Sequence, residues 1–143
     1  MSIDEDLVRQ LSEQLGFSRL LAVAYVNAGG RCEYCGTDLL MARQGYAIQE
    51  IDHLVPRSSN PALADHPLNQ VLCCRVCNGV KGHFHPAGAG EIEREQFNEQ
   101  QRREFLSIAR EHIASKMHRY DESWRKATQL LQEVWWKHGK YGG

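Results

Sequence analysis

The fold is decided by residues 52–81, which read DHLVPRSSNPALADHPLNQVLCCRVCNGVK. An acid and an imidazole, Asp52 and His53, stand side by side at the start of this stretch. Two amides, Asn69 and Asn78, follow nine residues apart, and a cation ends the stretch. Cys-x-x-Cys pairs lie before it and inside it, so we expect one bound metal to hold it in shape. Its polar residues are then available for a second metal and a phosphodiester.

The cysteine pairs are Cys32/Cys35 and Cys74/Cys77, separated by 38 residues. Turns of this spacing can present four thiolates in the near-tetrahedral arrangement that suits a structural Zn²⁺, with no open position for substrate. The alternative interpretations are four buried free thiols or a redox pair. Cys73 lacks the two-residue spacing and is expected to be a small buried hydrophobe.

Composition limits the possible classes of protein. The chain has 143 residues, 42% of them hydrophobic, which is enough for one domain with an appendage. It shows no apolar run of about 20 residues and no basic and apolar leader, so we expect a cytoplasmic protein without a membrane span. Five cysteines without a leader favour metal binding over disulfides. A net charge of −1 is unusual for a stand-alone nucleic-acid binder, so a second protein could supply cationic surface.

Helical signals dominate residues 1–30. Asp4 can cap a helix that runs to Gly16, and residues 18–28 form a second, apolar helix. The first helix is expected to place its apolar side chains on one stripe: Leu7, Val8, Leu11 and Leu15.

The centre of the chain alternates between strand and loop signals. We expect a strand over residues 46–54, from loosely alternating β-branched residues, and a very short strand over residues 71–72. Proline, serine and asparagine make residues 56–67 a loop, and residues 74 to about 83 form a short helix. Residues 41–42 fit either helix or loop.

Beyond a Pro- and Gly-rich hinge at residues 86–90, residues 91–138 are highly charged, lack glycine and proline, and are expected to be helical. Asp121 caps a second helix there, or one helix runs through. We expect the apolar stripe of this segment to pack on the N-terminal helices and complete the core. The alternative is that part of the stripe docks a partner or a second copy. The stripe comprises Phe105, Ile108, Ala109, Ile113, Met117, Tyr120, Trp124, Ala127, Leu131, Val134 and Trp135.

Three residues of the central block suit phosphodiester hydrolysis. His53 titrates close to neutral pH and is the natural general base for the attacking water. Asp52 and the amide oxygen of Asn78 are hard ligands that suit one Mg²⁺ or Mn²⁺. Such an ion would act as a Lewis acid on the scissile phosphate.

Four further residues can assist. Asn69 can donate to the backbone or to His53 and so hold the base, and Lys81 can neutralise a phosphate oxygen. Arg57 and Arg75 are candidate clamps for the nucleic-acid backbone. Each residue also has a plain interpretation, as a turn, a cap or a solvated charge. Their joint occurrence inside a zinc frame favours the catalytic one.

This combination resembles the HNH endonuclease family, the zinc-bearing ββα-metal nucleases. The matching positions span about residues 30–85: Cys32-x-x-Cys35, Ile51-Asp52-His53-x-x-Pro56, and Asn69-x-x-Leu72-x-Cys74-x-x-Cys77-Asn78-x-x-Lys81. The resemblance implies that His53 is the general base, that Asp52 and Asn78 hold the divalent ion, and that Asn69 props the histidine loop. Many members have histidine where this chain has Asn78, which bears on metal preference. In some relatives extra histidines join the metal, but His83 and His85 are expected at the surface or toward substrate.

The resemblance over the centre of the chain, together with the helical signals on either side of it, predicts a mostly α, α+β fold in three parts. N-terminal helices (residues 1–30) and a C-terminal helical extension (residues 87–143) flank a zinc-stabilised ββα-metal nuclease core (residues 31–86). The extension would pack on the core or dock a partner.

Several functions fit the resemblance. Similar small proteins serve as nuclease subunits beside ATPases in anti-phage systems, as phage packaging nucleases, or as restriction-type enzymes. The first expectation is a metal-dependent endonuclease that cuts DNA. The alternatives are a non-catalytic zinc module that binds nucleic acid or protein, and a nuclease that is silent until a partner presents the substrate.

Overall fold

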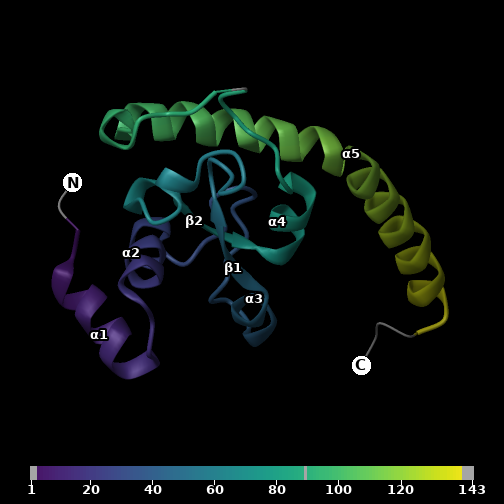
Figure 1. The fold of residues 1–143 in the computed structure, drawn as a ribbon. Coiled ribbons are helices and arrows are strands. Elements are labelled where there is room, and N and C mark those ends of the chain that lie inside the picture. The colour runs from purple at the N-terminus through teal and green to yellow at the C-terminus, as the bar shows by residue number, and fades with distance from the viewer. Residues whose placement is uncertain (1–2, 89, 140–143) are drawn as a thin grey trace. The chain divides into compact units, whose positions relative to one another are not determined.

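A computed structural model describes residues 3–88 and 90–139 (Figure 1). The chain divides into two compact units, one within residues 1–113 and the other within residues 114–143. The boundary falls inside the last helix rather than at the expected hinge, of which residue 89 lies outside the described residues. None of the described helices combines the length and apolarity that a membrane span requires.

The two predicted N-terminal helices are confirmed as α1 (Glu5–Leu15) and α2 (Arg19–Ala28). Asp4 and Ser18 cap them, each accepting a backbone amide of the first turn through its side chain. Gly16 adopts φ 70°, a left-handed conformation that favours glycine, and so ends α1 where the sequence predicted.

The prediction of one apolar stripe on α1 is correct for two of its four residues. Val8 is buried against α2, and Leu11 packs at the edge of the same cluster. Leu7 and Leu15 are exposed by 42% and 54% instead. The helix packs against α2 through the strip centred on Val8, which is narrower than the stripe read from the sequence.

The sheet consists of two antiparallel strands, β1 (Gln49–His53) and β2 (Gln70–Cys74). His53, the last residue of β1, pairs with Gln70, the first of β2. Helix α4 (Arg75–Lys81) follows β2 directly and contacts both strands, and Figure 1 shows the three elements grouped together. A small ββα unit inside a mostly helical chain confirms the predicted α+β class.

The strand predicted from residue 46 starts later, because α3 (Arg43–Ala47) occupies the beginning of that segment. Gly45 lies against the backbone of Asp38 and Leu39, where a Cβ atom would come within 3.1 Å of the Asp38 carbonyl oxygen. Glycine suits this position because a side chain would press against the neighbouring backbone. Residues 41–42 form a bend before the helix.

The other central predictions need smaller corrections. The predicted loop contains two 3₁₀ turns, η1 (Pro61–Leu63) and η2 (Pro67–Asn69). The strand predicted at residues 71–72 extends over all five residues of β2. Helix α4 ends at Lys81, earlier than predicted, because Gly82 takes a positive φ that leaves the helical region.

Helix α5 (Glu99–Lys137) runs through Asp121 without interruption, which settles the alternative left open by the sequence. It begins later than the predicted residue 91; only η3 (Arg94–Gln96) precedes it in that segment. The part of α5 in the first unit buries four apolar side chains: Phe105, Leu106, Ala109 and Ile113.

Arginines tie this first part of α5 to the core. Arg102 donates to the Leu68 and Gln70 carbonyls at 2.9 and 3.0 Å. It also pairs with the Glu33 carboxylate at 3.0 Å, and Arg110 donates to the Glu33 carbonyl at 2.6 Å. Glu33 lies between Cys32 and Cys35, so α5 braces the first cysteine turn.

Candidate metal centre and active site

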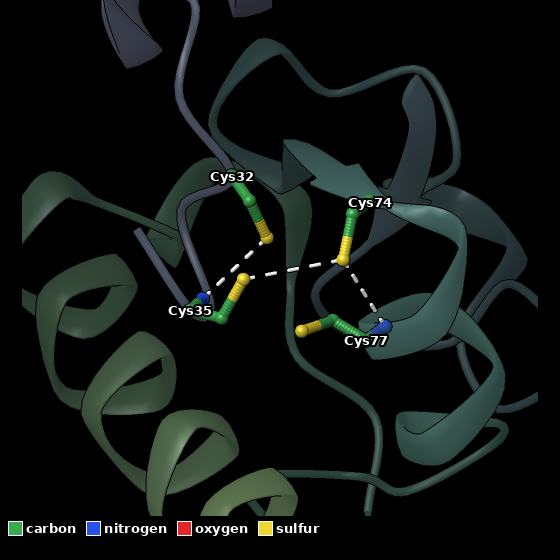
Figure 2. A group of neighbouring side chains, drawn as sticks. All are labelled: Cys32, Cys35, Cys74 and Cys77. Carbon is green, nitrogen blue, oxygen red and sulfur yellow. Dashed lines mark hydrogen bonds between the residues drawn. The ribbon is translucent and has the colours of Figure 1, made fainter. Parts of the chain in front are cut away.

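Four cysteine side chains converge in the first unit, from the turn before β1, the end of β2 and helix α4 (Figure 2). Their Sγ atoms all lie within 4.8 Å of one another, and those of Cys35 and Cys74 are 4.0 Å apart. Tetrahedral zinc with Zn–S bonds of about 2.3 Å requires sulfur–sulfur distances of roughly 3.8 Å. The four cysteines Cys32, Cys35, Cys74 and Cys77 are therefore positioned to bind a metal.

Backbone amides support the sulfurs. The Cys35 amide donates to Cys32 Sγ, and the Cys77 amide donates to Cys74 Sγ, both at 3.4 Å. The Thr37 hydroxyl lies 3.1 Å from Cys35 Sγ. Each Cys-x-x-Cys turn thus folds back on its own first sulfur.

Neighbouring thiols of the cluster influence one another's ionisation. The hydrogen bond with Cys32 lowers the pKa of Cys35 and raises the pKa of Cys77. One thiolate is thus favoured at the expense of its neighbours, and a bound cation would relieve their repulsion. None of the five cysteines forms a disulfide among the described residues. Cys73 is fully buried outside the cluster with its sulfur near the Glu50 carbonyl, as predicted.

A cavity of about 250 Å³ opens at the end of β1. Asp52, His53 and Asn78 all line it, together with the exposed Arg57 and His83. Adjacent strand residues normally point to opposite faces, but β1 ends at His53, and the turn that follows brings both side chains to one cavity. The structure thus brings together three residues that the sequence singled out.

The Asp52 carboxylate is held from two sides. Its Oδ2 accepts a hydrogen bond from the Tyr34 hydroxyl at 2.6 Å and lies 2.9 Å from Lys81 Nζ. The Lys81 side chain is fully buried, and its ammonium also donates to the His53 carbonyl at 3.0 Å. This position differs from the expected one, because the ammonium faces Asp52 rather than a phosphate. Within the described part of the chain, no hydrogen bond engages Oδ1 of Asp52.

Asn78 is oriented by Glu50, a residue that the sequence analysis missed. Asn78 Nδ2 donates to Glu50 Oε2 at 2.6 Å, and Arg75 Nε lies 3.0 Å from Glu50 Oε1. The hydrogen bond from Asn78, and then that from Arg75, lower the pKa of Glu50. An ionised carboxylate only accepts hydrogen bonds, so the Asn78 amide nitrogen must face it and the amide oxygen is left for another partner.

These sites coincide with a known domain. Residues 32–84 match the HNH endonuclease family. The matched segment covers less than half of the chain, and it contains the four cysteines and the cavity at the end of β1. The resemblance read from the sequence is confirmed over this segment. No curated protein matches the chain.

The loop of the HNH domain that follows His53 is fixed by Asn69, which is completely buried. Its side-chain oxygen accepts the Val55 amide at 2.7 Å, and its nitrogen donates to the Val55 and Leu63 carbonyls, both at 3.0 Å. The sequence left open whether Asn69 would bind the backbone or His53, and in the structure its side chain binds the backbone. Asn69 thus acts on the loop and not directly on the His53 ring.

Two residues inside the first cysteine pair connect the metal centre of the HNH domain to its surroundings. The Glu33 carboxylate accepts the Leu72 amide of β2 at 3.2 Å, besides binding Arg102. Tyr34 is buried and binds Asp52; burial and then the Asp52 charge raise its pKa, so it stays a donor. Sequence reasoning missed Glu33 and Tyr34. Their position between Cys32 and Cys35 was the only sign of a role, because the residues that they contact are distant in the chain.

Proposed function

We propose that this chain is a metal-dependent HNH endonuclease that hydrolyses DNA phosphodiester bonds. The observation that carries the proposal is the convergence of Asp52, His53 and Asn78 on one cavity. An acid, an imidazole and an oriented amide are the groups that a one-metal hydrolysis requires.

The four-cysteine centre supports a structural Zn²⁺. Four thiolates complete a tetrahedral shell, which leaves no position for water or substrate. Cys74 ends β2 and Cys77 lies in the first turn of α4, so the metal would fix the helix that carries Asn78. The zinc thus supports the geometry of the catalytic cavity and takes no part in the reaction.

His53 acts as the general base. The described residues offer its ring no hydrogen bond, so the ring is available to a water molecule in the cavity. Its backbone is fixed instead, since the His53 carbonyl accepts from Lys81 and Asn69 ties down the following loop. His53 takes the proton of the attacking water, a contribution of about 10²–10⁴-fold in rate.

Asp52 and Asn78 would hold the catalytic Mg²⁺ or Mn²⁺. Each offers a hard oxygen: Asp52 through Oδ1, and Asn78 through the amide oxygen that Glu50 turns away from itself. When bound, the ion supplies Lewis-acid stabilisation to the scissile phosphate and the leaving oxygen. Lys81 and Tyr34 both contact the other carboxylate oxygen of Asp52, Oδ2, and so position the carboxylate.

Two arginines are placed for contacts with the DNA backbone. Arg57 is exposed and lines the catalytic cavity, where it can bind a phosphate next to the scissile one. Arg75 is also exposed, and its ion pair with Glu50 keeps its guanidinium near the carboxylate that binds Asn78. With a net charge of −1, the chain has little further attraction for DNA. This supports a larger partner, such as an ATPase, that grips the nucleic acid.

A second candidate is a zinc module that binds nucleic acid or protein without cutting. The Lys81–Asp52 ion pair favours it, because a buried ammonium partly neutralises the carboxylate that should bind the catalytic ion. The two functions differ in whether His53 matters for chemistry.

A plasmid-nicking assay with Mg²⁺, Mn²⁺ or Ni²⁺ separates them. We expect the wild type to convert supercoiled DNA and His53→Ala to be slower by about 10²–10⁴-fold. His138→Ala, at an exposed position near the end of α5, is the matched control and should retain the wild-type rate. Cleavage that His53→Ala leaves unchanged would remove His53 from the mechanism, and no cleavage with any of the three ions would favour the binding module.

A further inference from the structure

The second unit carries an apolar seam with the spacing of a coiled coil. Along the green-to-yellow end of α5 in Figure 1, six residues recur at alternating intervals of three and four. In heptad notation, the a positions are 117, 124 and 131, and the d positions are 120, 127 and 134. The seam residues are Met117, Tyr120, Trp124, Ala127, Leu131 and Val134. A repeat of 3.5 residues sustained over three heptads is typical of helices that pack along one another.

Most of this seam is exposed. The exposed fractions are 68% for Tyr120, 65% for Trp124, 44% for Leu131 and 51% for Val134. A helix that is hydrophobic along one stripe is normally stabilised by burying that stripe against another element. Large apolar side chains that stay exposed in a continuous row mark a surface for a partner.

We propose that a second copy of this chain covers the seam, as a parallel and in-register coiled coil of residues 114–139. The seam is self-complementary, since each a and d residue would meet its own counterpart across a two-fold axis. Small Ala127 follows bulky Trp124, so successive layers differ in size as interdigitating side chains require.

The flanking charges favour the parallel orientation. In a parallel pair, Lys116 at a g position faces Asp121 at the following e position of the other helix, and symmetry makes this attraction occur twice. In an antiparallel pair with the whole seam overlapped, Lys116 would face Lys137 of the other copy instead. Like charges placed opposite each other select against that arrangement.

Two heptads further along, Leu130 and Trp135 occupy the matching g and e positions, so the parallel pair would also widen its apolar contact near the C-terminal end of α5. The proposal concerns the second unit alone and does not depend on nuclease activity.

Sedimentation equilibrium on the full zinc-loaded chain, from about 1 to 100 μM, tests the association. We expect a reversible dimer. Leu131→Asp should raise its dissociation constant by more than about 10²-fold, because two carboxylates would meet in one buried layer. Gln129→Asp makes the same charge change on the opposite face of the helix and should leave the constant within about threefold of wild type. A monomer throughout this range, or equal effects of the two variants, would overturn the proposal, and a monomer would point to a different protein as the occupant.

Cross-linking tests the orientation. In the parallel pair Val134 meets its own counterpart, so Val134→Cys should form a covalent dimer on mild oxidation, linked at residue 134 by peptide mapping. Gln129→Cys, whose side chain would face outward, is the control and should remain uncrosslinked. A dimer that Val134→Cys fails to link would rule out the parallel, in-register arrangement.

Discussion

The Tyr34 hydroxyl donates a hydrogen bond of 2.6 Å to Asp52 Oδ2. Tyr34 lies between two of the four cysteines positioned to bind a metal, and Asp52 lines the cavity at the end of β1. A single hydrogen bond therefore connects the metal centre to the carboxylate proposed to hold the catalytic ion. Because Tyr34 is buried, this contact is shielded from solvent and can fix the orientation of the carboxylate.

Removing this hydroxyl should impair catalysis more than folding. Tyr34→Phe keeps the ring but removes a hydrogen bond to a charged group, worth about 1.5–3 kcal/mol. We expect the cleavage rate to fall by about 10-fold or more, and the Mg²⁺ concentration for half-maximal rate to change, because Asp52 becomes less fixed. Zinc content should stay at one equivalent.

Tyr46→Phe is the matched control, because Tyr46 is 40% exposed and outside the cavity. Its rate should equal that of the wild type. If Tyr34→Phe also cleaves at the wild-type rate with an unchanged Mg²⁺ dependence, Tyr34 has no role in positioning Asp52.

The buried ion pair between Lys81 and Asp52 should matter for stability. Lys81→Met removes the ammonium but leaves the carboxylate in a largely buried site, since Asp52 exposes only 11% of its side chain. Breaking a buried pair from one side typically costs 3–5 kcal/mol, so we expect the free energy of unfolding in urea to fall by about 3 kcal/mol. Lys126→Met, at an exposed position, should change it by less than about 0.5 kcal/mol. Equal midpoints for the two variants would contradict a structural role for Lys81.

Local spacing made the metal centre and the adjacent positions of Asp52 and His53 predictable. Two Cys-x-x-Cys pairs specify four sulfurs whatever is folded between them. The predicted strand ran to residue 54, whereas β1 ends at His53, where both side chains line one cavity. The chemistry of Asn69 and the family resemblance both predicted that it holds the histidine loop, and its hydrogen bonds to the Val55 backbone support this role.

Partners that are distant in the chain could not be predicted. Glu50 orients Asn78 only because β1 and α4 pack together. Glu50 is two residues from Asp52 on β1, so both side chains lie on the same face of the strand. Lys81 was expected to neutralise a phosphate oxygen or, in the plain interpretation, to be a solvated charge. The packing of α4 on β1 buries it instead. The late start of β1 was also not predicted, because helix α3 occupies the beginning of the segment.

Loss of the structural metal should unfold the first unit. Cys35→Ala removes one of four thiolates, so we expect zinc content to fall well below one equivalent and the melting temperature to drop by more than about 10 °C. Cys73→Ala is the control, because Cys73 is next to Cys74 in the sequence but lies outside the cluster. The zinc content of this variant should match that of the wild type. Metal analysis and thermal unfolding, with and without a strong chelator, make the comparison. A chelated protein that melts like the zinc-loaded one would argue against a structural metal.

The Glu50 carboxylate should give both stability and cleavage a specific pH dependence. Hydrogen bonds from Asn78 and Arg75 lower its pKa in the folded state below its usual value of 4.5. Its stabilising contribution is therefore present above that usual value and is lost as pH falls through the lowered one. Solvent screening limits it to about 0.5 kcal/mol at neutral pH, because 30% of the side chain is exposed. Glu50→Gln should be less stable than wild type by that amount at pH 7, and the difference should disappear in acid.

Cleavage should respond more strongly than stability. A glutamine at position 50 can donate as well as accept, so it no longer forces the Asn78 nitrogen toward itself and the oxygen toward the cavity. We expect the rate of Glu50→Gln at pH 7 to fall by about 10-fold or more, while Glu111→Gln, at an exposed position on α5, cleaves normally. Rates measured with Asn78→Asp added to Glu50→Gln provide the sharper comparison, because a carboxylate at 78 offers an oxygen in either orientation. Recovery of cleavage in the double variant would support the orienting role of Glu50, and wild-type cleavage by Glu50→Gln alone would exclude it.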